Sequence, residues 1–319
     1  MFHAGEKAGI KRGMVTVGTP LLWVGFTAFI LAMLALDLGV FHRKAHAVSL
    51  KEALGWSLVW IALACLFGVG VWLYFGAELG KEYFAGYLIE KALSVDNLFV
   101  ILVIMGFFAV PKENQHKVLF WGILGALVMR AVFIFAGAAL LARFHWMMYA
   151  FGALLVFSAI KLLLQKEEDI NPEKNVLVRA YKRFFPATSH YVKDAFFVRE
   201  DGVLKATPLF LTVLAVEAAD LVFAVDSVPA VFAVTRDTFI VYTSNIFAIL
   251  GLRSLFFLLA GVMDKFHLLK YGLSLILLFV GAKMLLVDIY KVPINASLMA
   301  IGGTLVVSVL TSLAFPKKS

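Results

Sequence analysis

Cysteine is almost absent from this chain, and charge is scarce. Cys65 is its only cysteine, so one chain can form neither an internal disulfide nor a thiolate cluster for a metal. Charged residues make up 16% of the 319 residues, against about 25% in soluble domains. No GxxxxGKS/T phosphate-binding loop occurs. With 62% hydrophobic residues and a mean hydropathy of +0.92, these shortages indicate an integral membrane protein that is not driven by a nucleotide.

Long apolar stretches dominate the chain and predict its fold class. A bilayer core takes about 20 helical residues, and the stretches are too long and too continuously apolar to be strands. We therefore predict an all-α integral membrane protein with about nine transmembrane helices. The predicted spans are 20–41, 54–76, 83–109, 117–142, 144–164, 207–234, 239–262, 266–288 and 293–314.

The connecting segments contain most of the lysines and arginines, and their distribution predicts the orientation. The side that includes residues 165–206 is the more basic, so we expect it to face the cytoplasm. The tail of residues 1–19 is then extracytoplasmic and the tail of residues 315–319 cytoplasmic. On this interpretation the formal net charge of +8 reflects placement in the membrane and not binding of nucleic acid.

Residues 165–206 form the longest polar interval. The piece from Phe196 to Ala206 is typical of a β-hairpin that turns at Asp201 and Gly202. The simpler interpretation of the interval is a cytoplasmic loop that joins two halves and lies partly on the lipid headgroups. Docking of a partner, such as secretion or insertion machinery, is the alternative.

One pattern of charged residues occurs twice. Glu90 and Asp96 lie six residues apart in the first copy, as Asp220 and Asp226 do in the second. An arginine and then a lysine follow each pair, namely Arg130 and Lys161, then Arg253 and Lys283. Each copy covers three predicted helices, so the two enter the membrane from opposite sides, as in the inverted repeats of secondary transporters. The organisation is two helices (20–76), repeat 1 (83–164), repeat 2 (207–288) and a last helix (293–314).

Both acidic stretches offer oxygen ligands, and neither contains histidine or cysteine. Residues seven apart differ by about 20° around a helix, so Glu90 shares a face with Asn97, and Asp220 with Ser227. Oxygen-only sites favour hard cations such as Mn²⁺, Mg²⁺ and Ca²⁺. The candidate metal ligands are Glu90, Asp96, Asn97, Glu217, Asp220, Asp226, Ser227 and Asn245.

Pro229 follows the second acidic pair. Its missing N–H leaves the carbonyl of Val225 without its helical partner. We therefore predict a discontinuous helix here, with the Val225 carbonyl as an additional ligand. A kink that serves packing alone is the alternative.

Basic residues at membrane depth offer a competing explanation for the acids. A purely structural network of ion pairs would need no transported ion. Clustered acids nevertheless repel one another, which leaves such a cluster ready for a divalent cation or for protons. The expected charge partners are Arg130, Arg253, Lys161 and Lys283.

Two sequence motifs resemble signatures of the TerC family (tellurium-resistance protein C). They are EKALSVDNLFV from Glu90 and TPLFLTVLAVEAADLVFAVDSVPAVFAVTRDTFIVYTSNIFAILGLRSLFFLLAG from Thr207. The VGTPLLWVGF start at Val17 is closest to the family's alkaline-induced Alx branch. The resemblance implies a bacterial inner-membrane protein of the lysine-exporter group, with roles in manganese export, metal supply to exported proteins and tellurium resistance. The acids of the family match Glu90, Asp96, Glu217, Asp220 and Asp226.

These observations predict a secondary transporter that exports a divalent cation, with Mn²⁺ the first choice, by alternating access and with protons as the expected coupling ion. We expect no permanently bound cofactor, and lipid, the cation and protons as partners. A broader Ca²⁺ or Mg²⁺ antiporter is one alternative. A non-transporting scaffold that aids metalation or insertion of other proteins is another. An enzyme is the least favoured class, because no nucleophile–base pair lies at membrane depth.

Overall fold

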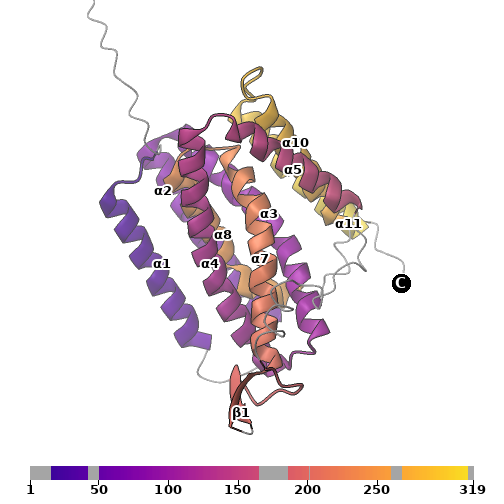
Figure 1. Cartoon of the computed structure of the whole chain (residues 1–319). Helices are drawn as coiled ribbons and strands as arrows, with labels where there is room; N and C mark the ends of the chain where they lie inside the picture. The colour runs from indigo at the N-terminus through magenta and orange to yellow at the C-terminus, as the bar shows by residue number, and fades with distance from the viewer. Residues whose placement is uncertain (1–15, 42–49, 165–185, 201, 260–267, 315–319) are drawn as a thin grey trace, which may run out of the picture.

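A computed structural model describes most of the chain, and helices account for nearly all of it (Figure 1). The described residues are 16–41, 50–164, 186–200, 202–259 and 268–314. Within them, side chains are not described for residues 36–41, 50, 96, 99 and 269. The side chain of Asp96, a predicted ligand, therefore lies outside the described residues.

The described helices lie at each of the predicted spans. In the first half they are α1 (Pro20–Phe41), α2 (Leu50–Phe75), α3 (Ala77–Phe107), α4 (Lys112–Arg143) and α5 (Met147–Leu164). In the second half they are α7 (Pro208–Phe232), α8 (Thr238–Leu250), α9 (Leu252–Leu259), α10 (Leu269–Leu285) and α11 (Ile294–Ala314). Two short strands precede α7, β1 (Phe197–Glu200) and β2 (Val203–Ala206).

Five of these helices are long and apolar enough to cross a bilayer by themselves, namely α2, α4, α5, α7 and α11. The pair α8 and α9, bent by 42° at its break, adds a sixth span if the two count as one. The described side chains of α1 cover only Pro20–Ala35, and α10 has 17 residues. The 31-residue helix α3 carries the charged residues of the first acidic stretch. The chain is thus a multi-pass helical membrane protein, and the count of nine spans stays a prediction.

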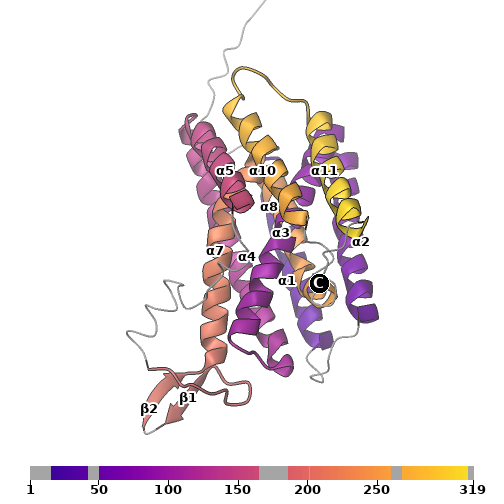
Figure 2. The same ribbon diagram turned by 90° about the vertical axis from the view of Figure 1, so that its right-hand side faces the viewer.

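The helices α3 and α7 lie next to each other at the centre of the bundle and run in opposite directions (Figures 1 and 2). A hydrogen bond between the hydroxyl of Thr235 and the carboxylate of Glu82 joins the end of α7 to the start of α3. At the opposite end of the bundle, Tyr191 Oη donates to the Phe108 carbonyl at 2.7 Å. Around this central pair, α3 packs against α8, α4 packs against α7, and α5 packs along α10.

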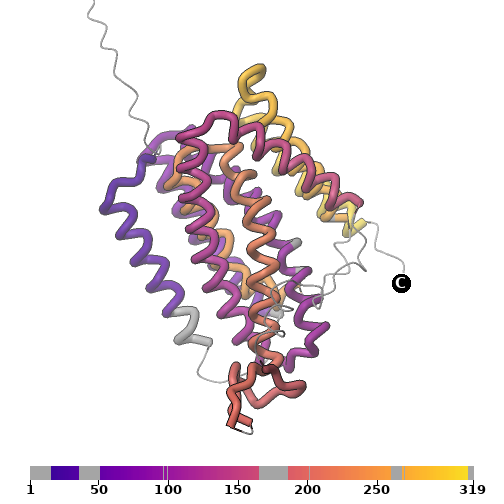
Figure 3. Tube along the Cα trace, in the orientation of Figure 1, coloured from indigo at the N-terminus to yellow at the C-terminus, as the bar shows by residue number. Residues whose placement is uncertain are grey.

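The predicted hairpin is present at the end of the bundle where α7 begins (Figure 3). Strands β1 and β2 are antiparallel, and Glu200 pairs with Val203 across the turn. Gly202 has a φ of 79°, a conformation that glycine adopts without a steric penalty. The preceding residues attach to the bundle, because Asn114 Nδ2 donates to the Lys193 carbonyl at 2.9 Å. Residues 165–185 of the predicted loop lie outside the described residues.

The helix break predicted at Pro229 is wrong, because α7 runs continuously through this residue. One missing N–H removes a single hydrogen bond, and the buried residues around Pro229 keep the helix in place. The break lies instead at Gly251, between α8 and α9. There Lys91 Nζ donates to the Ala248 carbonyl at 3.2 Å, which satisfies an acceptor near the end of α8. A Cβ at Gly251 would lie 3.0 Å from Lys91 Nζ, so glycine makes room for this lysine.

Candidate functional site

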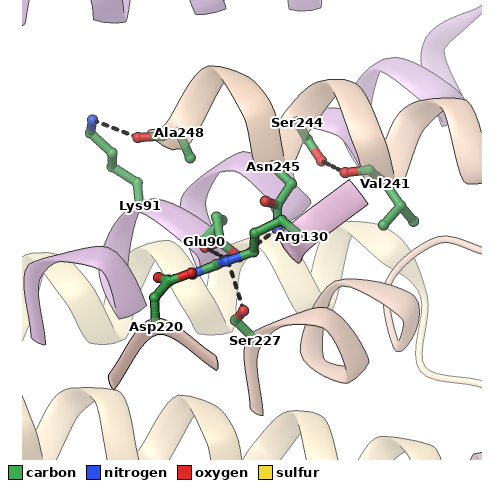
Figure 4. Close-up of polar contacts among 9 residues, drawn as sticks. All are labelled: Glu90, Lys91, Arg130, Asp220, Ser227, Val241, Ser244, Asn245 and Ala248. Atoms are coloured by element: carbon green, nitrogen blue, oxygen red, sulfur yellow. Dashed lines mark hydrogen bonds and ion pairs between the residues drawn. The ribbon is translucent and has the colours of Figure 1, made fainter. Parts of the chain in front are cut away.

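The guanidinium of Arg130 lies at the centre of a buried polar cluster between four helices (Figure 4). Its Nη1 atom forms a hydrogen-bonded ion pair with Glu90 Oε1 of α3 and donates a hydrogen bond to Ser227 Oγ of α7 at 2.8 Å. Its Nη2 atom lies 3.5 Å from Asp220 Oδ1, also of α7. The arginine itself comes from α4, and its side chain is fully buried. Two acids and a hydroxyl from different helices thus converge on one cation.

Two amide side chains complete the cluster. Asn245 of α8 donates from Nδ2 to Glu90 Oε2 at 2.8 Å, so both oxygens of this carboxylate are engaged. The Asn97 amide is satisfied when its oxygen faces Arg130 Nη2 at 3.3 Å and its nitrogen faces the Leu93 carbonyl at 3.0 Å. We call the five side chains around Arg130 the oxygen cage: Glu90, Asn97, Asp220, Ser227 and Asn245.

Helix geometry explains why these residues meet. Glu90 and Asn97 lie on one face of α3, and Asp220 and Ser227 lie on one face of α7, because each pair is seven residues apart. The two helices are in contact, and the two faces meet. The four residues from the acidic stretches therefore lie together, as their spacing indicates.

The cage does not satisfy all of its own polar atoms. Among the described residues, no hydrogen-bond partner is available to Asp220 Oδ2, Asn245 Oδ1 or Arg130 Nε, and all three atoms are buried. An unsatisfied buried polar group costs about 1–3 kcal/mol. The cage thus has two oxygens, Asp220 Oδ2 and Asn245 Oδ1, that do not bind the Arg130 guanidinium at its centre.

The seven predicted ligands whose side chains are described do not form one metal site in this conformation. Within the described part of the chain, no three histidine, cysteine, aspartate or glutamate side chains lie close enough together to hold a metal ion. The two carboxylates of the cage, Glu90 and Asp220, are bridged by Arg130. The cage in this conformation is therefore closed around the arginine.

Two predicted ligands lie beside the cage and not in it. Asp226 accepts a hydrogen bond from Ser158 Oγ of α5 at 2.6 Å, because a shift of one residue from Ser227 turns its side chain by about 100° around α7. Glu217 lies one turn before Asp220, with its carboxylate directly against Gly125 of α4. Both acids therefore face neighbouring helices of the first half.

The other predicted residues have separate surroundings. Arg253 lies buried on α9, with Nη2 at 3.3 Å from His116 Nδ1 of α4. Lys283 Nζ donates to Ser297 Oγ of α11 at 3.0 Å, and Lys161 is exposed on α5. The side chain of Val225 is 37% exposed on the outer side of α7, and a ligand role for its carbonyl stays a prediction.

A second polar cluster, at the end of the bundle where α3 begins, was not predicted as a site. The Glu82 carboxylate accepts from Thr235, and Asp237 accepts at 2.9 Å from the N–H of Phe239 in the first turn of α8. Asp237 Oδ2 also accepts from the Val17 N–H at 2.6 Å. The signals in the sequence were Asp237 just before an apolar run, typical of a helix cap, and the placement of Glu82 two turns before Glu90.

The helical bundle and its buried acid–arginine cluster define a multi-pass membrane protein with a polar centre. The pattern of the "Integral membrane protein TerC family" matches residues 75–319, which is most of the chain. This protein belongs to the TerC family.

Its similarity to curated proteins covers nearly the whole chain. It is 56% identical over 298 residues to "Uncharacterized membrane protein STKORF319" of Myxococcus xanthus, covering 93% of each chain. It is 48% identical over 304 residues to "Putative membrane-bound redox modulator Alx" of Escherichia coli K12, covering 92% of this chain and 95% of that one. The protein of the same name from Salmonella typhi is 47% identical over 306 residues, covering 93% and 95%. No solved structure matches the chain significantly.

Proposed function

We propose that this protein is a secondary transporter, not an enzyme, that exports divalent cations from the bacterial cytoplasm, with Mn²⁺ as the main cargo. The observation that carries the proposal is the oxygen cage. Five oxygen-bearing side chains from three helices surround one buried position, and the positively charged guanidinium of Arg130 occupies it in this conformation. Buried carboxylates at membrane depth are rare, and they typically mark an ion path or a proton relay.

The chemistry of the cage favours a hard divalent cation. Its donors are carboxylate, amide and hydroxyl oxygens, which suit Mn²⁺, Mg²⁺ and Ca²⁺ better than Zn²⁺ or Cu⁺. Glu90 and Asp220, when ionised, carry two negative charges, which one divalent cation balances. Asp96, Asp226 and Glu217 are further acids of the same two helices, and in the proposal they line the path to the cage or carry protons on the return step.

The arrangement of the two halves supports alternating access. The helices α3 and α7 run in opposite directions, and α3 packs on α8 as α4 packs on α7. Contacts of this kind are expected of an inverted repeat whose halves exchange conformations. The proposal includes this repeat, membership of the lysine-exporter group, and an inner-membrane location with the N-terminus outside and the C-terminus in the cytoplasm.

The name of the Alx relatives suggests a redox role as a second candidate. The chain has one cysteine, Cys65, so one copy cannot form and break an internal disulfide. In our proposal, a redox effect of this protein would follow from the metal ions that it moves.

Transport by the purified protein in proteoliposomes tests the proposal. Uptake of Mn²⁺, Mg²⁺, Ca²⁺ and Zn²⁺ would be measured with and without a pH gradient. We expect Mn²⁺ transport, and we expect it to be faster when a pH gradient drives protons in the direction opposite to Mn²⁺. Transport should be lost in Glu90→Gln and in Asp220→Asn. Asp288→Asn is the matched control, because Asp288 is an exposed acid outside the helices.

Two results would overturn the assignment. One is a wild-type protein that moves none of the four ions, which would favour the scaffold alternative. The other is equal transport in the cage variants and the control, which would show that the cage is not the transport site. Faster movement of Ca²⁺ or Mg²⁺ than of Mn²⁺ would keep the site and change the cargo.

A further inference from the structure

Arg130 occupies the position that the transported ion would need. Four of the five cage residues contact its guanidinium directly, and the fifth, Asn245, contacts Glu90. The guanidinium therefore lies inside the cage and not at its edge. An ion can reach the same oxygens only if the guanidinium moves away.

The fit between Arg130 and the cage is incomplete. A guanidinium is planar and presents its N–H groups in one plane, whereas a metal ion accepts six or more oxygens from all directions. In the cage, Asp220 Oδ2 and Asn245 Oδ1 are buried acceptors to which no described residue donates, and Arg130 Nε is a buried donor for which no described residue provides an acceptor. These unused oxygens indicate that the cage has ligands for an occupant other than arginine.

Charge balance favours exchange over joint occupancy. With both carboxylates ionised, the cage and Arg130 together carry one net negative charge. Replacing the guanidinium by a divalent cation makes the cage neutral, whereas adding the cation beside the guanidinium leaves a net positive charge. Two cations a few ångströms apart in a buried site also repel each other strongly.

We propose that Arg130 is a tethered competitor for the cation site: its guanidinium fills the empty cage and leaves when the divalent cation binds. The inference rests on the proposed function, because the competing ion is the proposed cargo. It gives the empty transporter a way to change conformation without two unpaired carboxylates in its core, since the arginine neutralises one of them on the return step. It also opposes tight binding, which favours release of the ion.

Glu217 offers the displaced guanidinium a second partner. Its carboxylate lies against Gly125, five residues before Arg130 and therefore about 7.5 Å away along α4. Among the described residues Glu217 forms no hydrogen bond or ion pair. Asp220, which Arg130 contacts now, is three residues further along the same face of α7. A swing of the long arginine side chain by about one helical turn would exchange one acid for the other.

Equilibrium binding of Mn²⁺ to the full-length purified protein tests the inference. If Arg130 fills the cage most of the time, its removal in Arg130→Met should lower the apparent Kd for Mn²⁺ by at least about 10-fold. Transport should fall in the same variant, because the competitor that expels the ion is gone. Arg253→Met is the matched control, a buried arginine at the corresponding place in the second half, and it should leave the Kd unchanged. Weaker or unchanged Mn²⁺ binding in Arg130→Met would overturn the inference.

Added guanidinium ion supplies a readout that a merely structural role would not move. Millimolar guanidinium should compete with Mn²⁺ in Arg130→Ala and have no effect on Mn²⁺ binding in wild type or in Arg253→Ala. If the variants without a cation at residue 130 do not fold, Arg130→Lys serves instead, because it keeps the charge and loses the planar donors. It should bind Mn²⁺ more tightly than wild type, and weaker binding would overturn the inference.

The two proposals fail in different ways. Wild-type transport together with unchanged Mn²⁺ affinity in Arg130→Met and Arg130→Lys rejects the competitor and keeps the transporter. Tight, guanidinium-sensitive Mn²⁺ binding in Arg130→Ala without transport by wild type rejects the transporter and keeps the competitor. Absence of Mn²⁺ binding in every form rejects both.

Discussion

The two halves of the protein meet in two contacts of opposite character. At the centre, α3 and α7 meet through the charged residues of the oxygen cage. At the side, α5 and α10 approach so closely that a Cβ on Gly281 would lie 2.9 Å from the Gly152 carbonyl oxygen. Charged side chains can exchange partners at little steric cost, whereas backbones in direct contact cannot shift without a clash. The α3–α7 contact is thus an adaptable centre, and the α5–α10 contact is a rigid flank.

The largest effect is expected at the centre, from loss of Arg130 in the absence of metal. In Arg130→Met two buried carboxylates lose their counter-charge, and breaking a buried pair destabilises by about 3–5 kcal/mol. The melting temperature in detergent should fall sharply and recover on addition of Mn²⁺. The triple variant that also carries Glu90→Gln and Asp220→Asn should be far less unstable, because it leaves no charge unpaired. Equal instability of the single and triple variants would show that charge is not the cause.

A smaller loss is expected at the flank, from Gly281→Ala. The added methyl group meets backbone atoms of α5 at Gly152 and Val156, which cannot turn away as a side chain can. Overpacking of this kind costs about 1–3 kcal/mol, and added Mn²⁺ should not restore the stability. Gly303→Ala on α11 is the control, because nothing lies within 4 Å of its added Cβ. Similar melting temperatures of the two variants would remove the contrast between centre and flank.

The smallest effect is expected at an exposed cluster of hydrogen bonds between the start of α5 and the turn that follows α10. Hydrogen bonds from Tyr149 Oη at 2.6 Å and from His145 Nε2 at 2.7 Å hold the pKa of Asp288 below its usual value. A lowered carboxyl pKa stabilises the folded state above the unfolded value, about 3.9, and this contribution is lost as the pH falls through the folded value. Asp288→Asn should therefore narrow the difference in melting temperature between pH 7 and pH 3. A full-sized difference would show that this exposed cluster contributes nothing.

The positions of the helices and the composition of the cage could largely be predicted from the sequence. Apolar runs of bilayer length mark helices because the backbone has no other way to satisfy its polar groups in lipid. The spacing of seven between Glu90 and Asn97, and between Asp220 and Ser227, placed each pair on one face. Asn245, predicted as a ligand from the second helix of the other half, also lies in the cage.

The remaining features depend on distances between helices, which local patterns do not contain. The repeat presents Arg130 and Arg253 as equivalents, yet Arg130 lies among the acids and Arg253 lies beside His116. The bend at Gly251, just before Arg253, turns α9 away from the line of α8. Pro229 predicted a break that α7 does not have. The break at Gly251 coincides with a half-buried lysine, Lys91, whose Nζ donates to the carbonyl three residues before the glycine. Nothing in the residue pattern around Gly251 indicates that lysine.

The sequence by itself determined that this protein is a helical membrane protein, where its helices lie, and which of its faces carry oxygen ligands. These properties follow from hydrophobicity and helical period, which are local. Only the tertiary structure decided that the ligand faces close around Arg130, that Asp226 turns towards Ser158, and that α5 and α10 pack on glycine. These contacts arise from the packing of helices that are far apart in the chain. Which partner a buried charge has depends on which side chains of the neighbouring helices lie within hydrogen-bonding distance of it.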